Sequence, residues 1–283
     1  MKDDRRALVL AGGGITGIAW ELGMVAGLAE LGVDLSGADL VIGTSAGSVA
    51  GAQLRSGRPL EQLYADQLRD AHGEVATELG RRTMLRWALL DLAPGPAERA
   101  RKRIGKAALS SKTVPESDRR QVIESRLPEP GWPRRAFKVT AVDASTGEFV
   151  VFDRESGVPL VDAVGASCAV PMVWPPVSIG GRRYIDGGVR SSANADLAQG
   201  YGRVVVLVPF ATSLRRSGRV DHQIEKLGPH VHTAVVMPDA NARRAMGSNA
   251  LDPAFRSDAA KAGRSQARLV RDSVAVAWGR PPS

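Results

Sequence analysis

An apolar run passes directly into glycines in the segment Ala7-Leu8-Val9-Leu10-Ala11-Gly12-Gly13-Gly14-Ile15-Thr16-Gly17. Residues 7–11 are short and aliphatic, which predicts a buried strand. From about Thr16 to Leu31, apolar residues recur at intervals of three and four, which predicts a helix. A strand that turns through glycines into a helix is the first half of a β-α-β unit.

The same pattern returns in Leu40-Val41-Ile42-Gly43-Thr44-Ser45-Ala46-Gly47. Residues 40–43 predict a second buried strand, and residues 46–54 predict the helix that follows it. Two successive strand–turn–helix units imply right-handed crossovers between parallel strands. We therefore expect an α/β protein whose central sheet is mostly parallel.

The remaining chain contains further strand and helix patterns, with no internal repeat and no clear linker. Alternating or apolar runs predict strands at 137–142, 148–152, 204–208 and 233–237, and a hairpin with a Gly-Gly turn at 178–184. Helical patterns cover residues 60–79, 83–92, 160–170 and 253–278. Residues 213–228 are polar, and we expect an irregular, mobile segment there.

Composition indicates a globular protein of 283 residues, with 43% hydrophobic and 24% charged residues. Cys168 is the only cysteine, which excludes an intramolecular disulfide and a cysteine-based zinc cluster. A reducing, cytoplasmic location is therefore expected. No window approaches the roughly 18–20 apolar residues that a membrane-spanning helix requires.

The formal net charge of +8 favours contact with anionic surfaces. Basic residues are concentrated at about 97–135, where prolines also interrupt the pattern, so we expect a basic helical insertion there. Only 5% of residues are aromatic, and no basic stretch interleaves with aromatic residues as a platform for stacking single-stranded bases does, so no nucleic-acid partner is expected. The basic stretch predicts either peripheral contact with an anionic membrane or a merely solvated face. Residues 83–92 are apolar nearly all round, which predicts either a core helix or a lid or membrane-facing helix.

The two glycine-bracketed turns together indicate an acyl-transfer site. Ser45 lies between Gly43 and Gly47 at a strand-to-helix turn, the setting of a nucleophile elbow. The amide of Ala46 opens the following helix, and its N–H is the first expected oxyanion donor. The amides of Gly13 and Gly14 are expected to supply the remaining donors.

Two nucleotide-binding motifs compete for the first glycine loop. Gly12, Gly14 and Gly17 also match the dinucleotide fingerprint, which requires an acidic residue at the end of the next strand. Asp34 and Asp39 precede that strand instead, and the serine turn occupies its end. A Walker loop is excluded because no Gly-Lys-Ser/Thr follows.

Asp186 is the candidate base. It follows a predicted hairpin strand and precedes Gly187 and Gly188, a setting that directs a carboxylate toward a cleft. A Ser-Asp-His triad is the alternative, because three histidines follow Asp186 in the required chain order: His222, His230 and His232. These histidines lie in or beside a polar segment without a clear strand end. His72 precedes the candidate aspartate. A Ser–Asp dyad therefore fits better than a triad.

Taken together, these motifs resemble those of the patatin-like phospholipase family. The match comprises the glycine loop at 12–17, the serine turn at 43–47 and the Asp-Gly-Gly at 186–188, with secondary matches at 139–147 and 166–171. It covers about residues 7–210. We treat the whole chain, 1–283, as one domain with the motif-bearing core at 7–210, the basic insertion at about 97–135 and a C-terminal helix at about 253–278.

The resemblance implies a three-layer α/β/α sandwich and a Ser–Asp dyad that hydrolyses a lipid ester through an acyl-enzyme intermediate. It implies no metal and no cofactor, and leaves the oligomeric state unknown. Thr16 stands where many relatives carry Arg or Lys, so a neutral lipid or simple ester competes more strongly with a phospholipid as the substrate. Two competing hypotheses are a Ser-Asp-His esterase and a non-catalytic lipid-binding or regulatory protein on the same fold.

Overall fold

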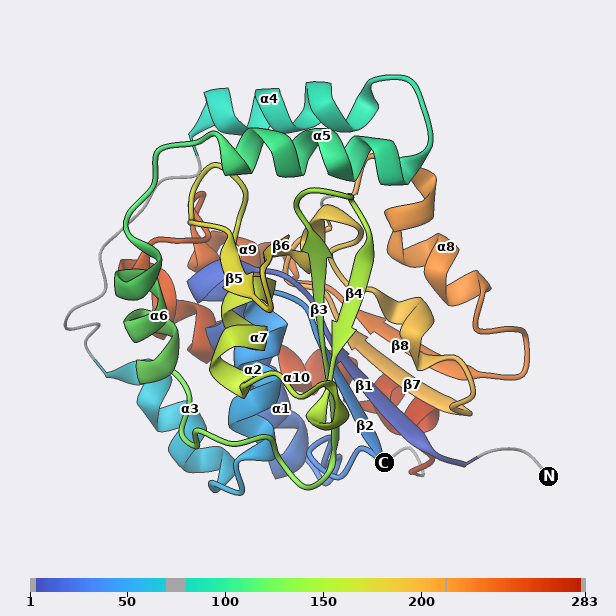
Figure 1. Ribbon diagram of the computed structural model, residues 1–283. Coiled ribbons are helices and arrows are strands. Elements are labelled where there is room, and N and C mark those ends of the chain that lie inside the picture. Colours follow the sequence, from blue (N-terminus) through green and yellow to red (C-terminus); the bar gives the residue numbers. More distant parts are fainter. Residues whose placement is uncertain (1–3, 70–79, 212, 281–283) are drawn as a thin grey trace.

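An eight-stranded sheet forms the centre of the protein, as seen in the computed structural model, which describes residues 4–69, 80–211 and 213–280 (Figure 1). The strands are β1 (Arg6–Leu10), β2 (Leu40–Gly43), β3 (Ala136–Asp143), β4 (Phe149–Phe152), β5 (Val177–Ile179), β6 (Arg182–Asp186), β7 (Arg203–Leu207) and β8 (His232–Val236). The α-helices are α1 (Gly14–Glu30), α2 (Ala46–Arg55), α3 (Leu60–Leu68), α4 (Arg81–Leu92), α5 (Ala97–Leu109), α6 (Glu116–Ser125), α7 (Leu160–Ser167), α8 (Val220–Glu225), α9 (Ala240–Met246) and α10 (Arg256–Trp278).

The strand order is β5-β6-β3-β2-β1-β7-β8, with β4 on the remaining edge of β3. Strands β3, β2, β1, β7 and β8 are mutually parallel, whereas β4, β5 and β6 pair antiparallel. The central parallel strands β1, β2 and β7 consist mainly of aliphatic residues because both of their faces are buried.

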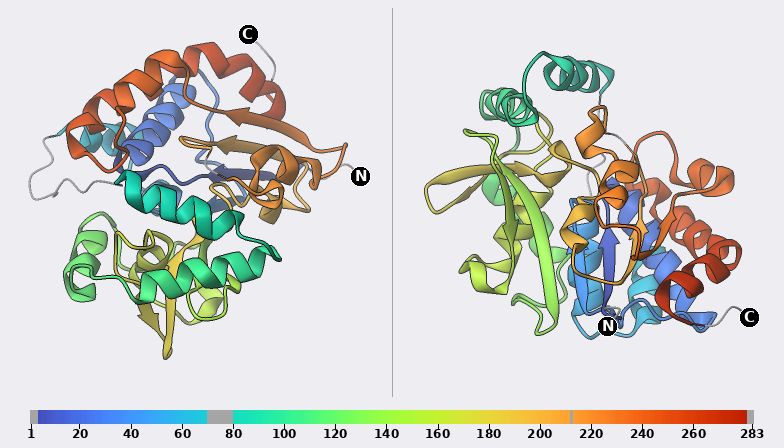
Figure 2. Two further views of the ribbon diagram at one scale, coloured as in Figure 1. Left: turned by 90° about the horizontal axis from the view of Figure 1, so that it is seen from above. Right: turned by 90° about the vertical axis from the view of Figure 1, so that its right-hand side faces the viewer.

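Helices cover both faces of the sheet. One face packs against α1, α2, α7 and α10. The other packs against α8 and a short 3₁₀ helix, η3 (Ala195–Ala198). The predicted three-layer sandwich with a mostly parallel sheet is therefore confirmed, and Figure 2 shows it from two further sides.

Close packing of α1 on α10 explains part of the glycine usage. An added Cβ at Gly23 would lie 2.0 Å from the carbonyl oxygen of Ala260, and one at Gly263 would lie 2.3 Å from that of Trp20. The two helices therefore approach through their backbones. The Trp20 indole N–H donates to Gln266 Oε1 at 3.0 Å within this interface.

The branching of the sheet at β3 brings two distant chain segments together. Val139 pairs with Gly43 of β2 and with Phe152 of β4, whereas Ala141 pairs with Asp186 of β6 and with Val150 of β4. A strand residue has one neighbour on each side. Strand β4 occupies one side of both Val139 and Ala141, so β2 and β6 must both lie on the other side of β3. They approach it from opposite directions, so their carboxyl ends meet.

Two sequence-based interpretations of individual segments are wrong. Of the two alternatives for the apolar segment 83–92, the core helix is wrong, because α4 exposes Leu85, Leu89 and Leu92. The polar segment 213–228 contains α8, whose Val220 packs on a cluster that includes strand residues and whose Gln223 is buried beside Ser191 and Ala195. The predicted continuation of the α3 face through residues 70–79 lies outside the described residues. No helix among the described residues combines the length and apolar character needed to cross a bilayer.

Candidate active site

The turn between β2 and α2 holds Ser45 in a backbone conformation that non-glycine residues rarely adopt. Its φ is 52° and its ψ is −118°. The flanking glycines make the turn possible: a Cβ at Gly47 would lie 2.0 Å from the Leu10 carbonyl oxygen, and one at Gly43 would lie 2.5 Å from the Gly47 carbonyl oxygen. Ser45 is partly exposed, whereas the residues on both sides are buried.

The carboxyl end of α7 fixes this turn. The Ser45 amide donates to Ser167 Oγ at 2.9 Å, and the Ser45 carbonyl oxygen accepts from Cys168 Sγ at 3.3 Å. Ser48 Oγ also donates to that carbonyl, at 2.6 Å. Ser167 and Cys168 belong to a segment whose motif was recognised in the sequence, but their contact with Ser45 was not predicted.

Asp186 ends β6 at the point where β2 also ends, and the Ser45 side chain lies within reach of its carboxylate. The side chain is buried, with 3% of the residue exposed, and the Gly188 amide donates to its Oδ1 at 2.7 Å. Burial raises the pKa of Asp186 to about 7, against the opposing effect of the hydrogen bonds from Ser45 and Gly188. The fold thus joins the two residues singled out from the sequence.

Three backbone amides near Ser45 are available to a ligand. In the parts of the chain that the structure describes, the N–H groups of Gly13, Gly14 and Ala46 donate to no protein acceptor, whereas that of Gly12 donates to the Ser192 carbonyl at 2.8 Å. A Cβ at Gly12 would lie only 3.5 Å from Ser45 Cβ, so the loop runs directly beside the serine. Unpaired amides beside a partly exposed hydroxyl form a suitable site for an oxyanion.

A buried asparagine, Asn194, links the segments that carry Ser45 and Asp186, and sequence reasoning did not identify it. Its side-chain amide donates to Thr44 Oγ1 at 3.0 Å and to the Gly187 carbonyl at 3.3 Å. The same amide reaches Thr140 Oγ1 of β3 at 3.3 Å, and Arg190 donates to Asn194 Oδ1 at 2.7 Å. An isolated Asn 8 positions after the aspartate gives no such signal in one sequence.

Replacing Asn194 with Ala is expected to cost stability and activity together. The change removes the donors that join Thr44, just after β2, to the loop after Asp186, and it leaves the buried Gly187 carbonyl without this donor. We expect a loss of about 1–3 kcal/mol in the free energy of unfolding and a fall in kcat. Denaturant unfolding and hydrolysis of a water-soluble ester measure the two effects. Unchanged stability with unchanged kcat would contradict the linking role.

Thr16 is completely buried, and a segment from the carboxyl-terminal part of the chain covers it. Its amide donates to the Ala250 carbonyl at 3.2 Å, and a Cβ at Gly14 would lie 2.4 Å from the same oxygen. The position therefore has no space for an extended, charged side chain in this arrangement. The glycine loop therefore lacks the positive charge that Arg or Lys would supply at this position, as the sequence indicated, and the segment around Ala250 covers it.

No hydrogen bond or ion pair joins any of the described histidines to Ser45 or Asp186. His222 contacts Glu225 at 3.3 Å. His232 pairs with Arg203 at the amino ends of β8 and β7, and exposed His230 lies two residues earlier. Ser45 lies at the carboxyl ends of the parallel strands, whereas His230 and His232 lie at their amino ends, at the opposite end of the sheet along the strand direction. His72 lies outside the described residues.

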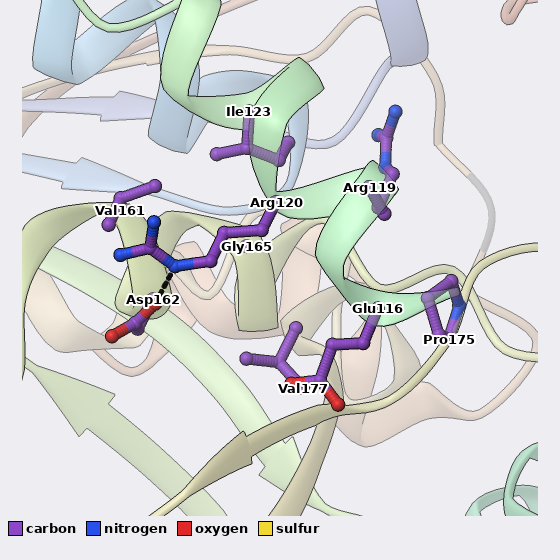
Figure 3. A pocket seen from close by; sticks show the side chains of 9 residues that line it. All are labelled: Glu116, Arg119, Arg120, Ile123, Val161, Asp162, Gly165, Pro175 and Val177. Carbon is purple, nitrogen blue, oxygen red and sulfur yellow. Dashed lines mark hydrogen bonds and ion pairs between the residues drawn. The ribbon is translucent and has the colours of Figure 1, made fainter. Parts of the chain in front are cut away.

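A small pocket between α6, α7 and β5 is separate from these residues (Figure 3). Ile123, Val161 and Val177 supply apolar walls, and Arg120 pairs with Asp162 at 3.0 Å. Neither Ser45 nor Asp186 lines it. Among the described residues, no three His, Cys, Asp or Glu side chains are grouped so that they could hold a metal ion.

A family profile described as patatin-like phospholipase matches residues 8–198. Proteins described as uncharacterized NTE family proteins, from Mycobacterium tuberculosis and Mycobacterium bovis, are 32% identical to the chain over 185 residues. These residues are 65% of this chain and 43% of each relative, so the match spans less than half the length of these proteins.

Two solved structures give matches over nearly the whole chain. VipD from Legionella pneumophila has a TM-score of 0.46 and 15% identity, covering 96% of this chain and 67% of that chain. ExoU of Pseudomonas aeruginosa, solved in complex with SpcU, has a TM-score of 0.41 and 16% identity, covering 95% of this chain and 53% of that chain.

Proposed function

This chain belongs to the patatin-like phospholipase family, and from that membership we propose that it is a serine acyl hydrolase that cleaves carboxylic esters of lipids. One observation supports the proposal most strongly: the partly exposed Ser45 side chain lies beside the buried Asp186 carboxylate, where the carboxyl ends of β2 and β6 meet. Family membership supports lipid hydrolysis in general, and this pair of residues supports a Ser–Asp dyad as its chemistry.

In the first half of the proposed reaction, Ser45 Oγ attacks the ester carbonyl carbon while its proton moves to Asp186. The carbonyl electron pair moves onto oxygen, where the amides of Gly13, Gly14 and Ala46 stabilise the negative charge. Collapse of this intermediate expels the alcohol, which takes the proton from Asp186. An acyl ester of Ser45 remains.

In the second half, water attacks the acyl ester as Asp186 accepts its proton. The same amides stabilise the second oxyanion, and its collapse returns the proton to Ser45 Oγ and releases the fatty acid. Asp186 is suited to both halves because burial raises its pKa to about 7. A base with a pKa near the working pH is both ionised and basic enough to accept a proton.

The substrate is proposed as a lipid carboxylic ester, either a phospholipid or a neutral lipid. The buried, uncharged Thr16 supports the neutral lipid, because no cation stands at that position beside the glycine loop. A panel of phospholipid, acylglycerol and simple fatty-acyl esters, hydrolysed by wild type and by Ser45→Ala in parallel, tests the proposal. Hydrolysis that persists in the variant would contradict it.

The pH profile of the reaction should follow the ionisation of Asp186. Because only the carboxylate accepts the Ser45 proton, kcat/KM should rise about tenfold per pH unit below about pH 6 and level off above about pH 8, around the pKa of about 7. The measurement uses a water-soluble ester so that lipid packing does not change with pH. A rate that stays constant from about pH 5 to 9 would be inconsistent with this base.

A further inference from the structure

The outer face of α4 carries an apolar stripe that the fold leaves uncovered. Leu85, Leu89 and Leu92 are each 63% exposed and follow one another at helical spacings of four and three. Arg82 and Arg86 are exposed on the same side of the helix. A single exposed leucine is ordinary, but a contiguous stripe of three indicates a contact surface.

Loose attachment of α4 does not explain this exposure, because its inner face and its carboxyl end are firmly held. Trp87 and Leu90 pack on a buried cluster that includes Ile104. Arg103 donates to the carbonyl of Ala93 at 2.8 Å, and Arg215 donates to the same carbonyl at 2.9 Å and to the Asp91 carboxylate at 3.1 Å. These cations occupy the last carbonyls of the helix, where they also complement its dipole.

Nearly all of the excess positive charge of the chain falls in the segment of sequence that carries this stripe. Residues 81–112, which span α4 and α5, contain nine basic and two acidic residues, a net charge of +7 against +8 for the whole protein. Arg99, Lys102 and Lys106 are exposed on α5. Figures 1 and 2 show α4 and α5 side by side on the outside of the molecule, at the end toward which β3 runs.

This surface is also directly joined to the candidate active site. Ile104 of α5 belongs to the same buried cluster as Ile185, which immediately precedes Asp186. Arg101 of α5 donates to the Gly147 carbonyl, just beyond β3, at 2.7 Å. A surface bound to α4 would therefore lie at the end of the molecule that contains Ser45.

We propose that the outer faces of α4 and α5, centred on Leu85, Leu89 and Leu92, dock the protein on an anionic lipid bilayer. The leucines enter the boundary between headgroups and acyl chains, as amphipathic interfacial helices do, and the surrounding cations contact anionic headgroups. This inference deepens the proposed function, since it supplies the route by which a lipid ester reaches Ser45. The net charge of +7 selects a lipid surface over an uncharged protein partner.

Vesicle co-sedimentation of the Ser45→Ala protein tests the proposal without hydrolysis of the lipid. Binding to phosphatidylcholine vesicles that contain about a third phosphatidylglycerol should exceed binding to pure phosphatidylcholine, and added salt should weaken it. Leu85→Gln with Leu89→Gln should lower the partition coefficient at least about tenfold. Arg82→Glu with Arg86→Glu lowers the net charge of residues 81–112 from +7 to +3 and should weaken the preference for anionic vesicles.

A matched control is Arg268→Glu with Leu269→Gln on α10, where Leu269 is 76% exposed beside an exposed arginine. The control should bind like the parent. Binding that all variants retain, or no binding to any vesicle, would overturn the docking proposal. Self-association that Leu85→Gln with Leu89→Gln abolishes, without an effect on vesicles, would overturn it in favour of a second copy as the occupant.

The same leucine substitutions, made in protein that keeps Ser45, separate this proposal from the enzymatic one. Hydrolysis of a water-soluble short-chain ester should proceed at the wild-type kcat/KM, while hydrolysis of vesicle lipid should fall. If the wild type also fails to hydrolyse the soluble ester, the proposed function is contradicted, while the vesicle-binding result still tests the docking proposal. An equal loss on both substrates would contradict a role restricted to docking.

Discussion

Ser45→Ala should reduce ester hydrolysis by roughly 10⁴–10⁶-fold, because loss of the nucleophile removes the covalent route while the amide donors remain. The protein should stay folded. Alanine is nearly the same size, and it can occupy the turn held by Ser167 and Cys168. Initial rates on a soluble ester, with unfolding followed by circular dichroism, measure both outcomes.

Ser45→Gly is an informative companion to this variant. The φ of 52° and ψ of −118° at this position are accessible to glycine without a Cβ clash, whereas serine is strained there. The glycine variant should therefore be inactive and about 1 kcal/mol more stable than wild type. A glycine variant that keeps wild-type activity would show that another group performs the attack.

Asp186→Asn should lower kcat/KM by roughly 10²–10⁴-fold, since an amide does not accept the Ser45 proton at neutral pH. Single replacement of each histidine should change kcat/KM by less than about twofold. One histidine whose loss matches that of Asp186 would transfer the base role to a triad.

The same substitution should stabilise the protein at neutral pH. Between its ordinary pKa of 3.8 and the folded value of about 7, Asp186 is protonated when folded and ionised when unfolded, so stability falls as pH rises through this window. Below the window both states carry the proton, and above it the penalty is constant. Asparagine never ionises, so Asp186→Asn should recover up to about 4 kcal/mol above pH 7 and nothing near pH 3. Equal effects at both pH values would contradict the raised pKa.

The parts of the site set by local backbone geometry were predictable from the sequence. Gly43 and Gly47 bracket Ser45 because the turn leaves no space for a Cβ, and such a requirement is visible in a single sequence. The parallel strands were equally clear, because burial on both faces produces continuous Val, Leu and Ile runs. Because both turns follow parallel strands, the glycine loop and the serine turn were expected at the same, carboxyl end of the sheet.

Features that depend on distant segments were not predictable. Residues 83–92 are apolar nearly all round, so their sequence does not predict which face of the helix is buried. In the structure Trp87 and Leu90 pack inward, and the leucine stripe is therefore exposed. The contact of Ala250 with the glycine loop, and the hydrogen bonds from Asn194 to Thr44 and Thr140, join residues that are far apart in the chain. Helix α8 was missed because its two buried residues lie in a mainly polar segment.

The most direct test of the Ser–Asp hydrolase is reaction with a fluorophosphonate, followed by peptide mapping of the adduct. A fluorophosphonate phosphonylates an activated serine, so the proposal predicts one stoichiometric adduct, located on Ser45. Labelling should be much slower in Asp186→Asn and absent in Ser45→Ala. An adduct on a different residue, or no adduct on the folded wild-type protein, would contradict the account.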